Sequence, residues 1–178
     1  MKEVVLHGRT FELYLTGEQV SAAVRELGLR LKNDFKDRDP LFVCIMNGSF
    51  MFASELMYTI DEEWEVAFAR YKSYEGTQST GRLQELLPVT QDLKGRVVVI
   101  VEDLIDTGYT VYCLKKLFLE QGAAEVHIAA MLRKPEAVSC DVDTDYVAMD
   151  IENKFILGHG LDYDEYGRMY KDIYQLKD

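Results

Sequence analysis

Residues 97–110 read Val97-Val98-Val99-Ile100-Val101-Glu102-Asp103-Leu104-Ile105-Asp106-Thr107-Gly108-Tyr109-Thr110, and this stretch decides the fold. Its five leading residues are apolar and β-branched, which predicts a strand buried on both faces, as in a parallel sheet. Three acidic residues follow, and then two threonines and a glycine come directly before a helical pattern. Hydroxyls, a glycine and free backbone N–H groups at a helix start predict an anion-binding turn, because the helix dipole and the unpaired donors both favour negative charge.

The acidic residues narrow the kind of anion that this turn would bind. Glu102 and Asp103 would repel a bare phosphate, but carboxylates accept hydrogen bonds from ribose hydroxyls and bind Mg²⁺. We therefore predict a sugar phosphate, with its phosphate on residues 107–110 and its hydroxyls near the two carboxylates. The alternative is a solvated acidic turn at an ordinary strand–helix junction, which the combination with Thr-Gly-x-Thr and a buried strand disfavours.

Composition and charge exclude several classes of protein. The chain has 178 residues, 48% of them hydrophobic, which is enough for the core of a globular domain. Its net charge of −11 argues against general nucleic-acid binding and against an anionic membrane surface. Three scattered cysteines, Cys44, Cys113 and Cys140, favour a reducing compartment. Neither a signal peptide nor a run of membrane-spanning length is found, so a soluble cytoplasmic protein is expected.

The rest of the chain alternates strand and helix patterns, which predicts an α/β fold with a mainly parallel sheet. Thr16 and Gln19 predict a capping box at the start of the first helix, and a second helix is expected from Ser49. A third helical pattern runs from Val111 to Phe118 and ends near Gly122. Predicted strands cover residues 11–15, 41–46, 64–69, 97–101, 126–132 and 146–149, and residues 173–176 form a short apolar segment near the end of the chain.

Residues 71–81 are polar, contain glycine and are too many for a tight hairpin. Loops of this length and composition often act as lids over a site. The alternative is a surface connector without a role, and composition alone does not separate the two.

The stretch from Val101 to Thr110 resembles the phosphoribosyl-diphosphate-binding motif of the type I phosphoribosyltransferases, and most of all that of their hypoxanthine-guanine branch. The likeness spans roughly residues 41–176, in five blocks in the expected order. It implies the type I phosphoribosyltransferase fold, a mainly parallel sheet flanked by helices with a small C-terminal hood. Residues 1–178 would form a single domain, with a core of about 16–150 and a hood of about 151–178 plus N-terminal residues.

The resemblance assigns the ribose phosphate to the organising stretch. Asp106 would manage the proton on the reacting nitrogen of a purine, a general acid–base role; helix capping by its side chain is the alternative. Glu102 and Asp103 would accept bonds from the ribose hydroxyls, directly or through Mg²⁺. The 5′-phosphate would bind the loop of Thr107, Gly108, Tyr109 and Thr110, where Tyr109 replaces a lysine that the family often has.

Two further loops match the family on the diphosphate side. Asn47 and Gly48 would bind the diphosphate, although Asn47 removes a cation and a plain turn is the alternative. Ser73 and Tyr74, with residues 78–81, match a catalytic loop that would close over the diphosphate and exclude water. Arg168 would reach the diphosphate, with a plain surface arginine as its alternative.

The purine side of the site is assigned to the last third of the chain. Lys134 would donate to the 6-oxo group, Phe155 would stack on the base, and Ile156 would offer backbone groups to it. Asp162 would contact Mg²⁺ and the edge of the base, so the implied metal residues are Glu102, Asp103 and Asp162. The alternatives are a solvated lysine at a strand end and a core phenylalanine.

The resemblance implies a Mg²⁺-dependent enzyme of purine salvage. It would transfer the 5-phosphoribosyl group from phosphoribosyl diphosphate to hypoxanthine or guanine, giving IMP or GMP and diphosphate. Its partners would be these small-molecule substrates, with no nucleic acid and no membrane, and it would form homodimers or homotetramers. The rivals are a transferase for xanthine or adenine, and an RNA-binding regulator on the same fold, which the acidic charge disfavours.

Overall fold

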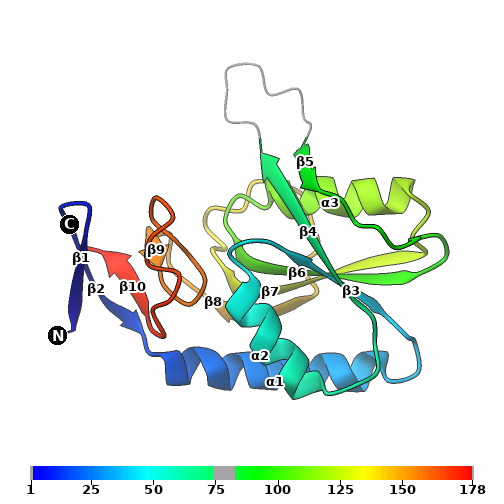
Figure 1. The fold of residues 1–178 in the computed structure, drawn as a ribbon, viewed down its shortest axis with the longest axis horizontal. Coiled ribbons are helices and arrows are strands. Elements are labelled where there is room, and N and C mark those ends of the chain that lie inside the picture. Colours follow the sequence, from blue (N-terminus) through cyan, green and yellow to red (C-terminus); the bar gives the residue numbers. More distant parts are fainter. Residues whose placement is uncertain (1, 74–82, 178) are drawn as a thin grey trace.

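The computed structural model describes residues 2–73 and 83–177. In chain order the strands and helices are β1 (Glu3–Leu6), β2 (Arg9–Leu15), α1 (Gly17–Phe35), β3 (Leu41–Ile45), α2 (Phe50–Ile60), β4 (Val66–Ser73), β5 (Leu83–Leu87), β6 (Val97–Ile105), α3 (Tyr109–Glu120), β7 (Glu125–Arg133), β8 (Tyr146–Asp150), β9 (Ile156–Leu157) and β10 (Ile173–Leu176). Figure 1 shows a central sheet between helices, with a smaller sheet at its side.

The central sheet has six strands in the order β5-β4-β3-β6-β7-β8. Every neighbouring pair is parallel except β4 and β5, which are antiparallel. The predicted α/β class with a mainly parallel sheet is therefore confirmed. Because the carboxyl ends of parallel strands meet at one edge of a sheet, the segments after β3, β6 and β7 come together there.

Helices cover both faces of this sheet, with α1 and α2 on one side and α3 on the other (Figure 1). Side chains of alternate residues in β6 point to opposite faces of the sheet. Val99 and Val101 pack toward α1 and α2, whereas Val98 and Ile100 pack toward α3. All four side chains are fully buried. This double burial explains why the sequence of β6 begins as an uninterrupted apolar run rather than alternating with polar residues.

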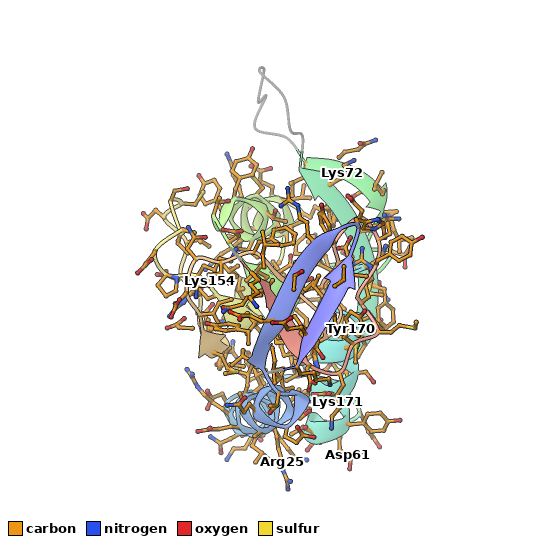
Figure 2. All side chains as sticks on the ribbon, turned by 90° about the vertical axis from the view of Figure 1, so that its left-hand side faces the viewer. Arg25, Asp61, Lys72, Lys154, Tyr170 and Lys171 are labelled. Carbon is orange, nitrogen blue, oxygen red and sulfur yellow. The ribbon has the colours of Figure 1, made fainter. Side chains whose placement is uncertain are left out.

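The smaller sheet joins both ends of the chain. Its four strands run β1-β2-β10-β9, and all of its pairs are antiparallel. Phe11, Leu157 and Tyr174 form its own buried cluster. Figure 2, in which this sheet faces the viewer, shows Tyr170 and Lys171 beside it, Lys72 near the end of β4, and Asp61 at the end of α2.

The helix starts follow the sequence closely. The Thr16 hydroxyl accepts from the Gln19 N–H (3.3 Å), and the Gln19 side chain accepts from the Thr16 N–H (2.9 Å), which confirms the predicted capping box. Helix α2 begins directly after Ser49, close to the expected start, although the Ser49 side chain makes no capping hydrogen bond, and Gly122 follows α3 with a φ of 96°. Within residues 2–73 and 83–177, no helix is both long and apolar enough to cross a membrane.

The largest errors in the predicted boundaries concern the ends of β6 and β4. β6 runs through Ile105 instead of ending at Val101, because it keeps its pairing with β7 as far as Ile105 opposite Arg133. Residues 71–73 are strand rather than loop, since they pair with β5, a strand that the sequence analysis missed. The rest of the predicted lid, residues 74–81, lies outside the described part of the chain.

Candidate active site

A cavity of about 440 Å³ lies at the carboxyl edge of the central sheet. Such a volume is within the range of small-molecule sites. It is lined by the segments that follow β3 and β6, by the outer part of β4, and by the C-terminal tail. The lining residues predicted from the sequence are Asn47, Gly48, Glu102, Asp103, Asp106, Thr107, Gly108, Tyr109, Thr110, Asp162 and Arg168.

Glu102 and Asp103 stand next to each other near the end of β6. Glu102 is only 8% exposed, and its carboxylate accepts from the Asp103 N–H at 3.1 Å. Asp103 accepts from the Leu104 N–H at 2.7 Å. Burial and then the neighbouring Asp103 charge raise the pKa of Glu102 well above its ordinary value. Burial also raises the pKa of Asp103. Two neighbouring carboxylates whose pKa values are raised in this way attract a cation, because a positive charge between them favours both charged forms.

The turn after β6 is built to present backbone donors. Gly108 is the N-cap residue of α3, and its φ of 81° lies in the left-handed region. The Thr107 hydroxyl accepts from the Tyr109 N–H at 3.3 Å. N–H groups in the first helical turn have no intrahelical acceptor, so this turn can receive an anion.

Asp106 does not cap the helix, which corrects the alternative interpretation of this residue. Its Oδ2 instead accepts from the Lys134 ammonium at 2.9 Å. The Lys134 side chain is 7% exposed and that of Asp106 is 50% exposed. Lys134 is therefore a buried cation held at the cavity edge by a cavity-lining carboxylate, and not the solvated strand end that was the alternative.

The loop after β3 packs directly on the acidic pair. The Met46–Asn47 peptide bond is cis. A Cβ atom on Gly48 would collide with the Asp103 carboxylate, so only glycine allows this approach. The Ser49 hydroxyl is fully buried and donates to the Ile45 carbonyl at 2.6 Å, which closes the loop onto the end of β3.

The C-terminal tail supplies another wall of the cavity. Arg168 binds Asp162 at 3.0 Å and Glu165 at 2.9 Å, and it donates to the Gly160 carbonyl at 3.1 Å. Its side chain is 19% exposed, which distinguishes it from a plain surface arginine. The charge of Arg168 also lowers the pKa of Asp103, against the larger effect of burial, so these groups from distant parts of the sequence lie close together.

Three predicted purine residues, Lys134, Phe155 and Ile156, are not among the residues that line the cavity. Phe155 is 47% exposed, so it is not a core phenylalanine, and its ring centroid lies 5.6 Å from that of Tyr163. Ile156 is 5% exposed and pairs with Gln175 in β10. Its side chain belongs to the core, which leaves only its backbone for a ligand.

The predicted catalytic loop is described only at its start. Ser73 ends β4, opposite Leu83 in β5. Tyr74 and residues 78–81 lie outside the described residues.

The described residues contain no cluster of three or more His, Cys, Asp or Glu side chains that could hold a metal. The three implied metal residues therefore form no ready-made cage, and Asp162 is engaged by Arg168. Mg²⁺ in nucleotide-type sites usually binds one or two carboxylates together with substrate phosphates and water. The pair formed by the buried Glu102 and the half-buried Asp103 meets that requirement.

Sequence reasoning missed a set of cavity residues on β4 and β5. Arg70, Tyr71, Lys72 and Leu86 line the cavity. Arg70 lies near enough to Glu165 to contribute to the lowered pKa of that carboxylate. Arg70 and Lys72 add positive charge to a cavity lining in which Asn47 and Tyr109 replace lysines common in the resembling family. The signal that could have revealed these residues is the alternating strand pattern of residues 64–69, which continues past Ala69.

Comparison with known proteins gives one consistent picture. The phosphoribosyl transferase domain family matches residues 12–164. A hypoxanthine-guanine phosphoribosyltransferase of Streptococcus pneumoniae is 39% identical over 168 residues, covering 94% of this chain and 93% of the relative. One from Mycobacterium bovis is 34% identical over 181 residues, covering 93% and 88%. The crystal structure of a hypoxanthine phosphoribosyltransferase from Staphylococcus aureus superposes with a TM-score of 0.88 at 33% identity, covering 93% and 91%.

Proposed function

The chain belongs to the phosphoribosyl transferase family, and from this premise we propose that it is a hypoxanthine-guanine phosphoribosyltransferase of purine salvage. The observation that carries the proposal is the cavity in which the acidic pair, the turn of residues 107–110 and Asp106 meet, with Asp106 bound to the buried Lys134 behind it. It offers acceptors for ribose hydroxyls, donors for a phosphate, and an acid–base group beside a buried cation.

The substrate phosphoribosyl diphosphate would bind with its 5′-phosphate on the N–H groups of residues 107–110. Its ribose hydroxyls would donate to Glu102 and Asp103. The diphosphate would lie between the Asn47–Gly48 loop and Arg168, with Arg70 and Lys72 adding positive charge. Glu102 and Asp103 would hold Mg²⁺, with Asp162 close by, and the metal would neutralise charge on the diphosphate.

The purine would bind beside Lys134, with Phe155 against its face. In the reaction the bond from ribose C1′ to the diphosphate oxygen breaks and a bond from C1′ to the purine nitrogen forms. The proton on that nitrogen passes to Asp106, which lies at hydrogen-bond distance from Lys134. Lys134 has three donors, so it can bind both Asp106 and a 6-oxo group. A 6-amino group offers no comparable acceptor.

We propose that the second sheet and the tail act as a hood over the base, within one domain with a core of about 16–150. The three cysteines are unpaired, in keeping with a reducing compartment such as the cytoplasm. A homodimer or homotetramer is expected from the family resemblance.

A panel of four purines tests the proposed substrate class. The purified protein is incubated with phosphoribosyl diphosphate, Mg²⁺ and one of hypoxanthine, guanine, xanthine or adenine, and diphosphate release is measured. We expect kcat/KM for hypoxanthine and guanine to exceed that for adenine by at least about 10²-fold, because a donor at the 6-position rejects an amino group. Turnover of adenine alone would refute the assignment, and turnover of xanthine alone would move it to another branch of the family.

Removal of Mg²⁺ should weaken substrate binding. With EDTA present, we expect the Kd for phosphoribosyl diphosphate to rise by at least about tenfold, because Glu102 and Asp103 then repel the polyanion. Isothermal titration calorimetry measures this without turnover, and excess Mg²⁺ should restore the original affinity. An unchanged Kd in EDTA would contradict the metal role of the acidic pair.

A further inference from the structure

His159 is a buried histidine in the tail segment that reaches the cavity, and it is 1% exposed. It lies between Gly158 and Gly160 with a φ of 51°, and its N–H donates to the Tyr170 carbonyl at 2.8 Å. Gly158 and Leu161 exchange two backbone hydrogen bonds of 3.0 Å, which closes a tight turn. The side chain of a turn residue normally points to solvent, whereas the His159 side chain is buried inside the protein.

The contacts of the His159 ring constrain which of its nitrogens donate and which accept. Nδ1 lies 3.0 Å from the Lys171 carbonyl oxygen, and a carbonyl only accepts, so Nδ1 carries a proton. Nε2 is buried without a hydrogen-bond partner and lies 3.4 Å from Oε1 of Glu55 in α2. In a neutral ring, Nε2 would present a lone pair to a carboxylate oxygen, which is repulsive. A proton on Nε2 converts the contact into an imidazolium–carboxylate pair.

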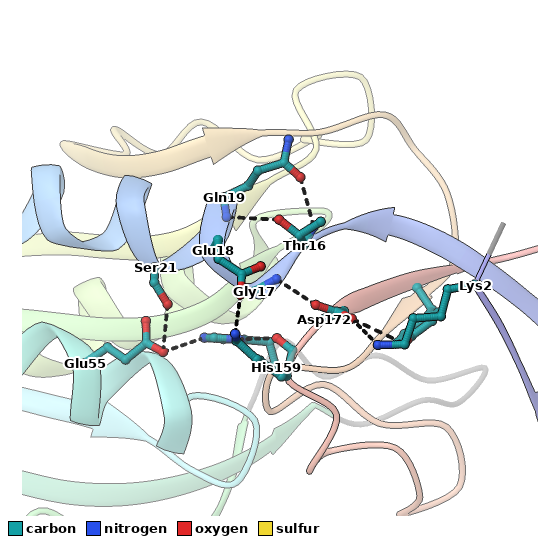
Figure 3. Close-up of polar contacts among 11 residues, drawn as sticks. Lys2, Thr16, Gly17, Glu18, Gln19, Ser21, Glu55, His159 and Asp172 are labelled. Carbon is teal, nitrogen blue, oxygen red and sulfur yellow. Dashed lines mark hydrogen bonds and ion pairs between the residues drawn. The ribbon is translucent and has the colours of Figure 1, made fainter.

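Figure 3 shows that the other charges in this region have their own partners. The Lys171 ammonium pairs with Glu18. Asp172 accepts from the Lys2 ammonium at 2.6 Å and from the Gly17 N–H at 2.9 Å. None of these groups neutralises Glu55.

Within residues 2–73 and 83–177, Glu55 has no cationic partner other than His159. The Ser21 hydroxyl donates to its Oε1 at 3.2 Å, and its Oε2 is buried without a hydrogen-bond partner. Among the ion pairs of the described residues, Glu55 has no lysine or arginine partner. A partly desolvated carboxylate needs a counter-charge, and His159 is the group in place to supply it.

The contact links the two walls of the cavity. Glu55 lies on α2, which begins just after the Asn47–Gly48 loop. A Cβ atom on Gly160 would collide with the Gly48 carbonyl, so the tip of the histidine turn rests on that loop. The Gly160 carbonyl accepts from Arg168 at 3.1 Å, and the Gly160 N–H donates to the Arg168 carbonyl at 2.9 Å. Fixing His159 on α2 therefore fixes Arg168 relative to Gly48.

We propose that His159 is a positioning residue that, as an imidazolium paired with Glu55, sets the separation between the Asn47–Gly48 loop and Arg168. The consequence for phosphoribosyl diphosphate binding rests on the proposed function, whereas the charged pair does not. His159 touches no substrate; it acts through the turn.

Nuclear magnetic resonance tests the pair directly. The chain has three histidines, and the signals that vanish in His159→Gln belong to this ring. In the unmodified protein at pH 7, the ¹⁵N shifts should show both ring nitrogens protonated. Glu55→Gln should give a neutral ring with the proton on Nδ1, because a carboxamide can donate to Nε2. A neutral His159 ring in the unmodified protein would overturn the proposal, whatever the protein's activity.

A double-mutant cycle tests the positioning role. His159→Gln and Glu55→Gln should each raise KM for phosphoribosyl diphosphate about tenfold, with kcat within about threefold, because misplaced walls weaken binding. The double variant should be no worse than either single variant, since both remove one interaction. Ser21→Ala, which removes a neighbour without removing charge, is the matched control. Additive effects, or lower thermal stability with unchanged KM, would refute the positioning role.

The two proposals fail separately. If no purine is turned over, the proposed function is wrong, and the Kd for phosphoribosyl diphosphate measured by calorimetry replaces KM in the same cycle. Unchanged affinity in both single variants would then refute the positioning role.

Discussion

Replacing Asp106 with asparagine is expected to lower kcat by about 10²-fold to 10⁴-fold, the usual contribution of a general acid–base group. The amide keeps the shape of the side chain but cannot take the proton from the purine nitrogen. Binding of phosphoribosyl diphosphate should change much less, because its phosphate and ribose contact other residues. Steady-state kinetics and calorimetric Kd values for phosphoribosyl diphosphate separate the two effects.

Asp106→Asn also removes the carboxylate that pairs with Lys134 at 2.9 Å. A buried lysine without a counter-charge destabilises a protein, so thermal unfolding must be measured on the same sample. The matched control is Asp143→Asn, which alters an exposed aspartate that does not line the cavity. Equal losses in kcat and in phosphoribosyl diphosphate affinity would contradict the proton-transfer role.

Replacing Lys134 with glutamine should erode the preference for 6-oxopurines. A hydrogen bond from a charged group contributes about 1.5–3 kcal/mol, so kcat/KM for hypoxanthine and guanine should fall by roughly 10-fold to 150-fold. Glutamine can accept as well as donate, so adenine should be disfavoured less than before. Competition between hypoxanthine and adenine in one reaction measures the change in preference.

The control for Lys134→Gln is Lys116→Gln, an exposed helix lysine 4.0 Å from Glu120. Lys116→Gln removes one positive charge, as Lys134→Gln does, but at a position outside the cavity. It should therefore leave the purine preference unchanged. An unaltered ratio of hypoxanthine to adenine turnover in Lys134→Gln would show that Lys134 does not read the 6-position.

Local patterns predicted much of the architecture. The apolar run of β6 and the capping box at Thr16 that starts α1 each depend on neighbours in sequence, and each is confirmed. Local patterns could not predict where β6 ends. Glu102 and Asp103 look like turn residues, but pairing with β7 keeps them in the strand, and that pairing involves residues more than twenty positions away.

Long-range packing accounts for the other gaps. The second sheet pairs β2 with β10, from opposite ends of the chain, and no local pattern specifies that register. The Asp106–Lys134 ion pair joins the ends of β6 and β7 because the strands are neighbours, so sequence spacing gave no sign of it. The resemblance nevertheless placed most predicted site residues around one cavity, since strand ends in a parallel sheet share an edge.

The glycines at the centre of the site show the same limit. Gly48 and Gly160 look like ordinary turn residues in the sequence. In the structure a Cβ on Gly48 would meet Asp103, and one on Gly160 would meet the Gly48 carbonyl. Their requirement for glycine is a property of the folded site and not of either turn alone.

The most direct test of the account is a crystal structure with GMP bound. We predict that the 5′-phosphate accepts hydrogen bonds from the N–H groups of residues 107–110, with the ribose hydroxyls at Glu102 and Asp103 and the 6-oxo group at Lys134. A phosphate bound anywhere else, or a purine ring far from Lys134, would contradict it.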